Sequence, residues 1–275
     1  MPDGAEEIVV KPSKRRRSWK RWLANIMILA GVVLLAYVPG TWAYTWFQQR
    51  GLEAQLEQSS PQITSVAADL SATDFVPLEV KSDNAQQASA GEAEAAAETE
   101  AAAAAAAAAA EAYAEHKAQL DAFANAAKAY AATVTRQTGE PIGKIIIPSI
   151  GMDVIMVEGT GKGDLKVGPG HWPETPFPGQ GGNFVVSGHR TTFGAPFFKL
   201  NKVEPGDEID LVLPYAIARY TVTRVIIVLP TEVNEVAQLG REQISLAACH
   251  PIYSAKQRIV VQGDLTSFKL LSPQS

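Results

Sequence analysis

The sequence Ile244-Ser245-Leu246-Ala247-Ala248-Cys249-His250-Pro251, followed by Arg258-Ile259-Val260-Val261, decides the fold of the C-terminal half of this chain. Both segments contain apolar runs of strand length, and Pro251 ends the first of them. Antiparallel pairing of the two runs through the intervening loop would place Cys249 and Arg258 side by side. The first predicted element is therefore a pair of strands that carries a thiol next to a guanidinium.

Short apolar runs of the same kind recur upstream, from a change in composition at Gly139-Glu140-Pro141 onward. They are mostly β-branched and are separated by Gly, Pro, Asn or Asp, as is typical of strands and turns. The predicted strands lie at Lys144–Ile147, Val154–Val157, Asn183–Ser187, Glu208–Val212 and Arg219–Leu229, and short helices are expected at Lys162–Lys166, Pro196–Leu200 and Glu232–Leu239. This pattern predicts a mostly β fold, a closed or nearly closed β-barrel, as one domain over residues 139–268 with a tail at 269–275.

The N-terminal end combines a basic run with a long apolar segment. Residues 1–21 contain a dense group of Lys and Arg between Lys14 and Arg21, uninterrupted by acidic residues. Residues 22–47 are long and apolar enough to cross a bilayer, with Trp and Tyr near both ends as in an aromatic belt. We expect a single transmembrane helix with a cytoplasmic N-terminus, because Lys and Arg stay on the cytoplasmic side. A cleaved signal peptide is the alternative.

Two segments of different composition separate the apolar helix from the predicted barrel. Residues 48–90 are polar and mixed, which predicts a flexible linker. Residues 91–138 form an Ala/Glu-rich stalk with ten consecutive alanines, and the helix propensity of Ala and Glu predicts a helix from about Glu92 to Val134. Its later part has a weak apolar stripe. A coiled coil, docking on the barrel and a free spacer are all open, and the spacer is the favoured interpretation.

Charge and cysteine content limit the possible functions. The net charge of -5 argues against nucleic acid as a general partner. Cys249 is the one cysteine of the chain, so an exported protein of this sequence has no internal disulfide. An unpaired thiol in an oxidising compartment is either reactive or accidental. Cys249 is therefore the first candidate nucleophile.

A reactive cysteine needs a proton carrier and a group that stabilises the oxyanion. Four histidines occur in the chain: His116, His171, His189 and His250. The first two fall on the predicted stalk helix and in a turn-rich loop. His250 adjoins the thiol, but neighbours on a strand point to opposite faces. His189 follows a predicted strand, where binding and catalytic groups are often held on a rigid frame, and it is the candidate proton carrier.

Four segments together resemble the sortase family. They are Gly143–Gly151, similar to the opening strand of the sortase barrel; Gly168–Pro173, similar to the family's Gly-Pro-Gly-His-Tyr/Trp-Pro loop; Gly182–Arg190, similar to the strand that carries the catalytic histidine; and Leu246–Pro251 with Arg258–Val261, similar to the cysteine and arginine signature. The resemblance covers about residues 141–265. The Cys-His-Pro and Gly-His-Arg-Thr-Thr forms look most like class E sortases of actinobacteria, with class F or D next. The resemblance implies a sortase-like closed β-barrel of about eight strands with short helices, preceded by the transmembrane helix and the helical stalk.

The same resemblance implies a cysteine transpeptidase located at the plasma membrane with its catalytic domain outside the cytoplasm. Cys249 would cleave a C-terminal sorting motif of the Leu-Pro-x-Thr-Gly or Leu-Ala-x-Thr-Gly kind between Thr and Gly. A thioester would form, and an amine of a cell-wall precursor or a pilin would resolve it. His189 would carry protons, Arg258 would bind the oxyanion or the motif, and Ala247 and Ala248 would contact the substrate. No cofactor and no metal is implied.

One departure from the family pattern concerns Ala248, because sortases usually carry Thr immediately before the nucleophile. We expect this change to affect substrate preference and rate. Some sortases bind calcium through loop carboxylates, but Glu232 and Glu235 are too few to predict such a site. Two rival classes stay open: a non-catalytic surface scaffold with a degenerate barrel, and a cysteine peptidase that only hydrolyses. Anchoring to the cell wall is favoured over pilus assembly, since no obvious lid motif precedes Pro141.

Overall fold

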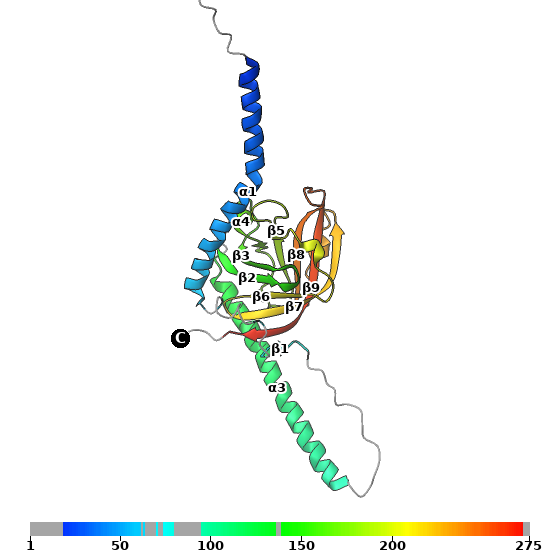
Figure 1. The fold of residues 1–275 in the computed structure, drawn as a ribbon. Coiled ribbons are helices and arrows are strands. Elements are labelled where there is room, and N and C mark those ends of the chain that lie inside the picture. Colours follow the sequence, from blue (N-terminus) through cyan, green and yellow to red (C-terminus); the bar gives the residue numbers. More distant parts are fainter. Residues whose placement is uncertain are drawn as a thin grey trace, which may run out of the picture. The chain divides into compact units, whose positions relative to one another are not determined.

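The computed structural model describes residues 19–61, 63, 70, 74–79, 95–135 and 139–271. The chain divides into two units, residues 1–40 and 41–275, and the strands belong to the second (Figure 1). The described helices and strands of the chain are α1 (Trp19–Ser59), β1 (Val76–Pro77), α3 (Ala95–Thr133), β2 (Pro141–Ile147), η1 (Pro148–Ile150), β3 (Met152–Glu158), α4 (Asp164–Val167), β4 (Gly170–His171), β5 (Asn183–Gly188), η2 (Leu200–Lys202), β6 (Glu208–Val212), β7 (Ala216–Val228), η3 (Val233–Val236), β8 (Gln243–His250) and β9 (Gln257–Leu270).

Eight strands close into a barrel, and β1 is added outside the ring. The order around the barrel is β9, β7, β6, β2, β3, β4, β5 and β8, and β8 pairs again with β9. The β3–β4 and β5–β8 pairs are parallel, and the other pairs are antiparallel. The predicted fold, a mostly β closed barrel of about eight strands with short helices, is therefore confirmed.

The shortest strand of the ring, β4, joins the two halves of the barrel. Gly170 pairs with Val157 of β3 on one side and with Ser187 of β5 on the other. A side chain at position 170 would meet the carbonyl oxygen of Gly159 at 2.0 Å, so only glycine permits this close approach. The sequence predicted only a turn-rich loop here, because two residues are too few to show the alternation of a strand.

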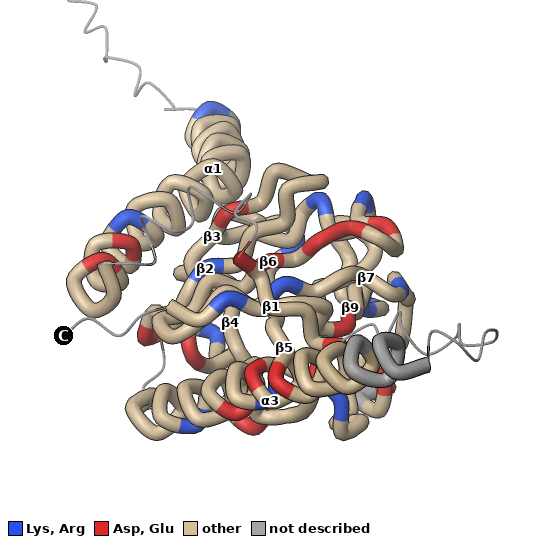
Figure 2. Tube along the Cα trace, turned by 90° about the horizontal axis from the view of Figure 1, so that it is seen from below, with Lys and Arg blue, Asp and Glu red and all other residues tan. Residues whose placement is uncertain are grey.

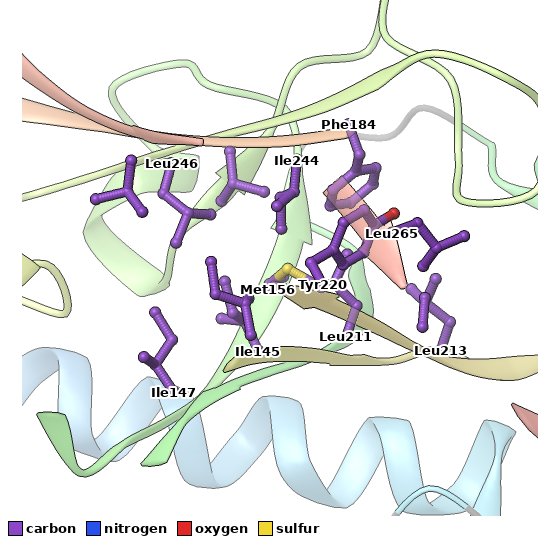
Figure 3. Close-up of a cluster of buried hydrophobic side chains, with 14 of the residues drawn as sticks. Ile145, Ile147, Met156, Phe184, Leu211, Leu213, Tyr220, Ile244, Leu246 and Leu265 are labelled. Carbon is purple, nitrogen blue, oxygen red and sulfur yellow. The ribbon is translucent and has the colours of Figure 1, made fainter. Parts of the chain in front are cut away.

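Apolar side chains fill the barrel interior (Figure 3). Because successive side chains of a strand point to opposite faces, Ile145 and Ile147 of β2 enter this interior cluster. Ile146 between them points outward and belongs to a second cluster with Ile155 and Val212. The barrel wall is therefore apolar on both faces in this region, and something must cover its outer face.

The C-terminal turns of α1 cover that outer face. Leu52 and Leu56 are buried in the second cluster. The side-chain amide of Gln49 accepts a hydrogen bond from the Ile155 N–H at 2.9 Å, and donates to the carbonyl oxygens of Ile155 at 3.1 Å and Val167 at 2.7 Å. Residues 48–59, which the sequence assigned to a flexible linker, are thus helical and packed. Most of the remaining predicted linker lies outside the described residues.

The alanine-rich segment forms the predicted helix, α3, which is seen in front of the barrel in Figure 2 and whose N-terminal half extends beyond the barrel in Figure 1. Its later part packs against the core, where Phe123 and Ala127 are 2% and 0% exposed. Phe123 stacks on Phe268 with the ring centroids 4.4 Å apart, and the Tyr130 hydroxyl donates to the Ile142 carbonyl oxygen at 2.9 Å. Of the three alternatives that the sequence left open, the later part of α3 therefore docks on the barrel. The favoured interpretation, a free spacer, is wrong for this part of the helix.

Residues 19–40, the first unit's described part, form the N-terminal turns of α1. Within the described part of the chain, α1 is the one helix long and apolar enough to cross a membrane. The large aliphatic side chains of these N-terminal turns are exposed, Leu34 and Leu35 at 75% and 79%. α1 is therefore a candidate membrane anchor. Most of the basic run on which the predicted orientation depends lies outside the described residues.

Candidate active site

Two strand pairings bring the predicted site residues onto one wall of the barrel. β5 and β8 run parallel with Gly188 opposite Ala248, so the next residues, His189 and Cys249, leave the pair at the same level. β8 and β9 run antiparallel with Cys249 opposite Arg258. Residues opposite each other on neighbouring strands share a face of the sheet. The register therefore sets the imidazole, the thiol and the guanidinium next to one another across the wall.

The alternation of side chains places this group on the outer face of the barrel. Ala247 shares the face of Cys249, because the two residues are separated by one position on β8. Ala248 and Ile259, on the intervening positions, are buried in the interior cluster. The thiol is therefore accessible from outside, while the strands that carry it are fixed by the core.

A cavity of about 370 Å³ lies over this face. It is lined by all three predicted catalytic residues, His189, Cys249 and Arg258, and by both predicted substrate contacts, Ala247 and Ala248. Trp172 and Ser187 also line it, and its other side consists of residues that end β7 or follow it: Val228, Leu229, Pro230, Glu232 and Val236. A mainly apolar cleft with a few convergent polar groups is typical of a site that binds a ligand and acts on it.

His189 is half-buried at the end of β5. Burial lowers the pKa of its imidazole, because desolvation disfavours the charged form, so the ring is neutral near pH 7 and able to accept a proton. The ring centroid of Phe193 lies 5.2 Å from that of His189. The Phe193 N–H donates to Thr41 Oγ1 at 3.2 Å, and Trp42 Nε1 donates to the Thr191 carbonyl oxygen at 3.5 Å. The loop that follows the histidine is thus held by α1.

Cys249 is a free, half-buried thiol at the end of β8. Beside it, the Arg258 Nη1 group donates to the carbonyl oxygens of Ala255 and Gln257, each at 3.0 Å. These bonds hold the guanidinium against the end of the β8–β9 loop. A guanidinium carries five N–H donors, so Nε and Nη2 of Arg258 also have donors suited to an oxyanion or a peptide carbonyl.

A buried network supports the side of the cavity formed by Trp172. The indole Nε1 donates to Ser187 Oγ at 2.8 Å. The preceding residue, His171, is 1% exposed, with Nδ1 2.7 Å from Glu158 Oε2 and Nε2 3.0 Å from Thr175 Oγ1. Both ring nitrogens of His171 are therefore engaged inside the protein, and this histidine does not line the cavity.

The other candidate residues lie apart from the cavity or are engaged elsewhere. His116 is half-buried on α3, and His250 has its Nδ1 3.3 Å from Arg190 Nη1; neither lines the cavity. Glu235 forms an ion pair with Arg224 at 3.0 Å. Within the described ranges, no group of three or more His, Cys, Asp or Glu side chains is arranged as metal ligands would be.

Arg190 is the residue near the site that sequence reasoning missed. It is 3% exposed, and its Nη1 group donates to the Cys249 carbonyl oxygen at 3.2 Å. An arginine in a loop is usually taken as solvated, because arginine is rarely buried. Its position directly after His189 was the available signal.

Comparisons with known proteins show which family the barrel domain is similar to. Residues 145–266 match the family model described as the sortase domain. The chain is 31% identical over 131 residues to sortase D of Bacillus subtilis, covering 46% of this chain and 65% of that protein, and 29% identical over 145 residues to sortase SrtE1 of Streptomyces coelicolor, covering 47% and 41%. It is also similar to the solved structure of sortase E from Streptomyces avermitilis, with 30% identity, a TM-score of 0.45 and coverage of 50% and 97%. The chain spans less than two thirds of the length of these two curated relatives.

Proposed function

Because this chain belongs to the sortase family through its domain at residues 145–266, we propose that it is a membrane-anchored cysteine transpeptidase. Its substrates are proteins that end in a sorting signal, cut between Thr and Gly of a Leu-Pro-x-Thr-Gly or Leu-Ala-x-Thr-Gly motif. The observation that carries the proposal is the shared cavity of Cys249, His189 and Arg258, set by the register of three adjacent strands.

The proposed reaction starts with transfer of the thiol proton of Cys249 to the neutral imidazole of His189. The thiolate attacks the Thr carbonyl, and the oxyanion accepts hydrogen bonds from Arg258. The intermediate collapses to a thioester as the C–N bond to Gly breaks, and imidazolium gives its proton to the leaving amine. An incoming amine then attacks the thioester, loses a proton to His189 and forms the new amide, which regenerates the thiol.

The proposed substrate path follows the two sides of the cavity. The small side chain of Ala247 leaves room above β8, where Ala248 also lines the cavity although its side chain lies in the interior cluster. Opposite them, Leu229 and Pro230 offer an apolar surface, which suits the leucine and the proline or alanine of the motif. The side chain of Ala247 carries no polar group, so recognition on this side depends on shape.

The proposed location is the plasma membrane, with α1 as a single-pass anchor and the barrel outside the cytoplasm. The apolar span of α1 and the basic residues that precede it support this orientation. We favour a class E-like enzyme, supported by the Cys-His-Pro form at Cys249 and by the similarity to sortase SrtE1 of Streptomyces coelicolor. The acceptor is then a cell-wall amine rather than a pilin.

A peptide assay tests the proposal. The full chain in detergent is incubated with each of the two motif peptides, with and without an added amine, and the products are identified by mass. We expect ligated product from the wild type, none from Cys249→Ala, and a loss of roughly 10²–10³ in rate for Arg258→Ala. His189→Ala is expected to retain traces, whereas His116→Ala, outside the cavity, serves as the control and should react normally.

Two other outcomes would replace the proposal. Cleavage with no ligation at any amine concentration would identify a peptidase that only hydrolyses. No cleavage, together with a Cys249 that a thiol-reactive probe does not label in the folded chain, would identify a non-catalytic scaffold.

A further inference from the structure

The strongest unexplained feature of the molecule is the buried cation next to the candidate nucleophile. The Arg190 guanidinium is 3% exposed. It donates to the carbonyl oxygens of Phe198 at 3.1 Å and Cys249 at 3.2 Å, and to Asn201 Oδ1 at 2.7 Å. Its fourth contact joins Nη1 to Nδ1 of His250 at 3.3 Å. One side chain thus ties the loop after His189 to the end of β8.

These contacts engage four of the five N–H donors of Arg190 without neutralising its charge. All four acceptors are uncharged, and Arg190 takes part in no ion pair with Asp or Glu among the residues that the structure describes. Burying an unpaired charge is costly, and a nearby negative charge offsets the cost. Burial lowers the pKa of Arg190, and negative charge on Cys249 acts in the opposite direction. The backbone carbonyl of Cys249 is one of its acceptors, so this cation lies next to the residue that carries the thiol.

The same contacts assign the two histidines beside the thiol to different tasks. A guanidinium has donors and no acceptor, so Nδ1 of His250 is the acceptor of the Arg190 contact and carries no proton in this arrangement. His250 is thereby held outside the cavity. His189, which lines the cavity, has no such constraint and is left to carry the proton.

We propose that Arg190 is a positioning residue that fixes the Cys249–His250 segment and, as a buried cation, favours the thiolate of Cys249. This role differs from that of Arg258, whose half-exposed guanidinium faces the cavity and is assigned to the substrate or oxyanion. The inference rests on the proposed function in taking Cys249 as the nucleophile. The test, however, measures the reactivity of the Cys249 thiol and does not require the protein to be catalytically active.

The experiment is the pH profile of Cys249 alkylation by iodoacetamide in the full-length chain. Because the chain has one cysteine, all incorporated label reports this thiol. Other charged and titratable groups near this thiol can also affect its alkylation profile. They are His189 after β5, Arg258 on β9, Glu232 after β7, and His250, which contacts Arg190. Arg190→Met is expected to move the midpoint of the profile up by about one pH unit and to slow alkylation near neutral pH about tenfold.

Three further variants separate charge from packing. Arg190→Lys keeps the cation and should restore most of the profile while turnover stays low, since an ammonium does not reproduce the guanidinium fork. Asn201→Ala removes one partner of Arg190 and leaves its charge, so its profile should match the wild type. Arg258→Met removes the other cation near the thiol. It should move the midpoint of the alkylation profile less than Arg190→Met does, because Arg258 is more exposed to solvent.

A second measurement keeps the inference testable if Arg190→Met does not fold. If Arg190 favours the thiolate as proposed, wild type should gain stability over Cys249→Ser as the pH rises from neutral into the alkaline range. This gain should persist in an Arg258→Met background and should be largely retained in Arg190→Lys, which keeps the cation. A folded Arg190→Met with the wild-type profile, or a pH-independent stability difference, would overturn the inference. Ligation that survives Cys249→Ala would instead refute the proposed function and leave the alkylation shift intact.

Discussion

The docking of α3 predicts that one aromatic side chain supplies much of the contact between this helix and the barrel. Phe123 is 2% exposed, stacks on Phe268 with ring planes 8° apart, and lies 6.1 Å from the Tyr215 ring. Phe123→Ala removes a buried ring and leaves a cavity, which in protein cores costs about 3–5 kcal/mol in the free energy of unfolding. We expect a loss of this size here.

The surroundings of Phe123 place the expected loss in the upper part of that range. The backbone at Gly179 lies against α3, because a Cβ there would be 3.1 Å from both the Phe123 carbonyl oxygen and Ala127 Cβ. A site enclosed by backbone on one side collapses poorly when a side chain is removed. The stacked pair with Phe268 adds about 0.5–1.5 kcal/mol beyond the buried area.

Urea unfolding of the full chain in detergent, followed by circular dichroism, measures the effect. Tyr113→Ala is the matched control, since Tyr113 lies on the same helix and is 64% exposed. It should change the free energy of unfolding by less than about 0.5 kcal/mol. Equal effects of the two substitutions would show that α3 is not packed on the barrel, and would return it to the role of a spacer.

Three further predictions concern the contact of α1 with the barrel, a buried carboxyl group and the candidate proton carrier. Gln49→Leu leaves the backbone groups of Ile155 without partners and should cost about 2–4 kcal/mol in urea unfolding, whereas Gln48→Leu, which loses one exposed bond to Tyr44, should cost little. Burial raises the pKa of Glu242, so the folded state loses stability as the pH rises above the ordinary carboxyl value of about 4.3; Glu242→Gln should therefore melt higher than wild type at pH 7 and equal it near pH 4. Because burial lowers the pKa of His189, the acid side of the kcat/KM profile should fall below the ordinary histidine value of about 6.5, and a limb above that value would contradict the assignment.

The barrel and the position of the site could be predicted because their signals are local. The β-branched runs between Gly, Pro, Asn and Asp coincide with strands such as β6, which spans the predicted Glu208–Val212. The predicted pairing of Cys249 with Arg258 follows from a hairpin, in which a short loop limits the register. These features need no information from distant parts of the chain.

The features that escaped sequence reasoning all depend on distant partners. β4 is a strand only because β3 and β5 lie on both sides of it. Leu52 and Leu56 show no sustained period in the sequence, and they are buried because the outer face of β2 and β3 is apolar. Arg190 is buried because Asn201 and the end of β8 accept its hydrogen bonds. In each case tertiary contacts override the local preference.

The parallel pairing of β5 and β8 shows how such distant contacts set the chemistry. Residues 189–242 separate the two strands, so no turn fixes their register, and a slip by one residue would send the thiol to the opposite face. The register is held at the far end of the pair. There the side-chain amide of Gln238 accepts from the Asn183 N–H at 2.6 Å and donates to its carbonyl oxygen at 2.9 Å, and the Gln243 N–H donates to Gly182 at 2.8 Å. The six paired residues of β5 and β8 span about 20 Å between these bonds and the site, so the register fixed at one end also aligns His189 with Cys249 at the other. The segment after β7 therefore lines one side of the cavity and also aligns the two strands that bear the imidazole and the thiol.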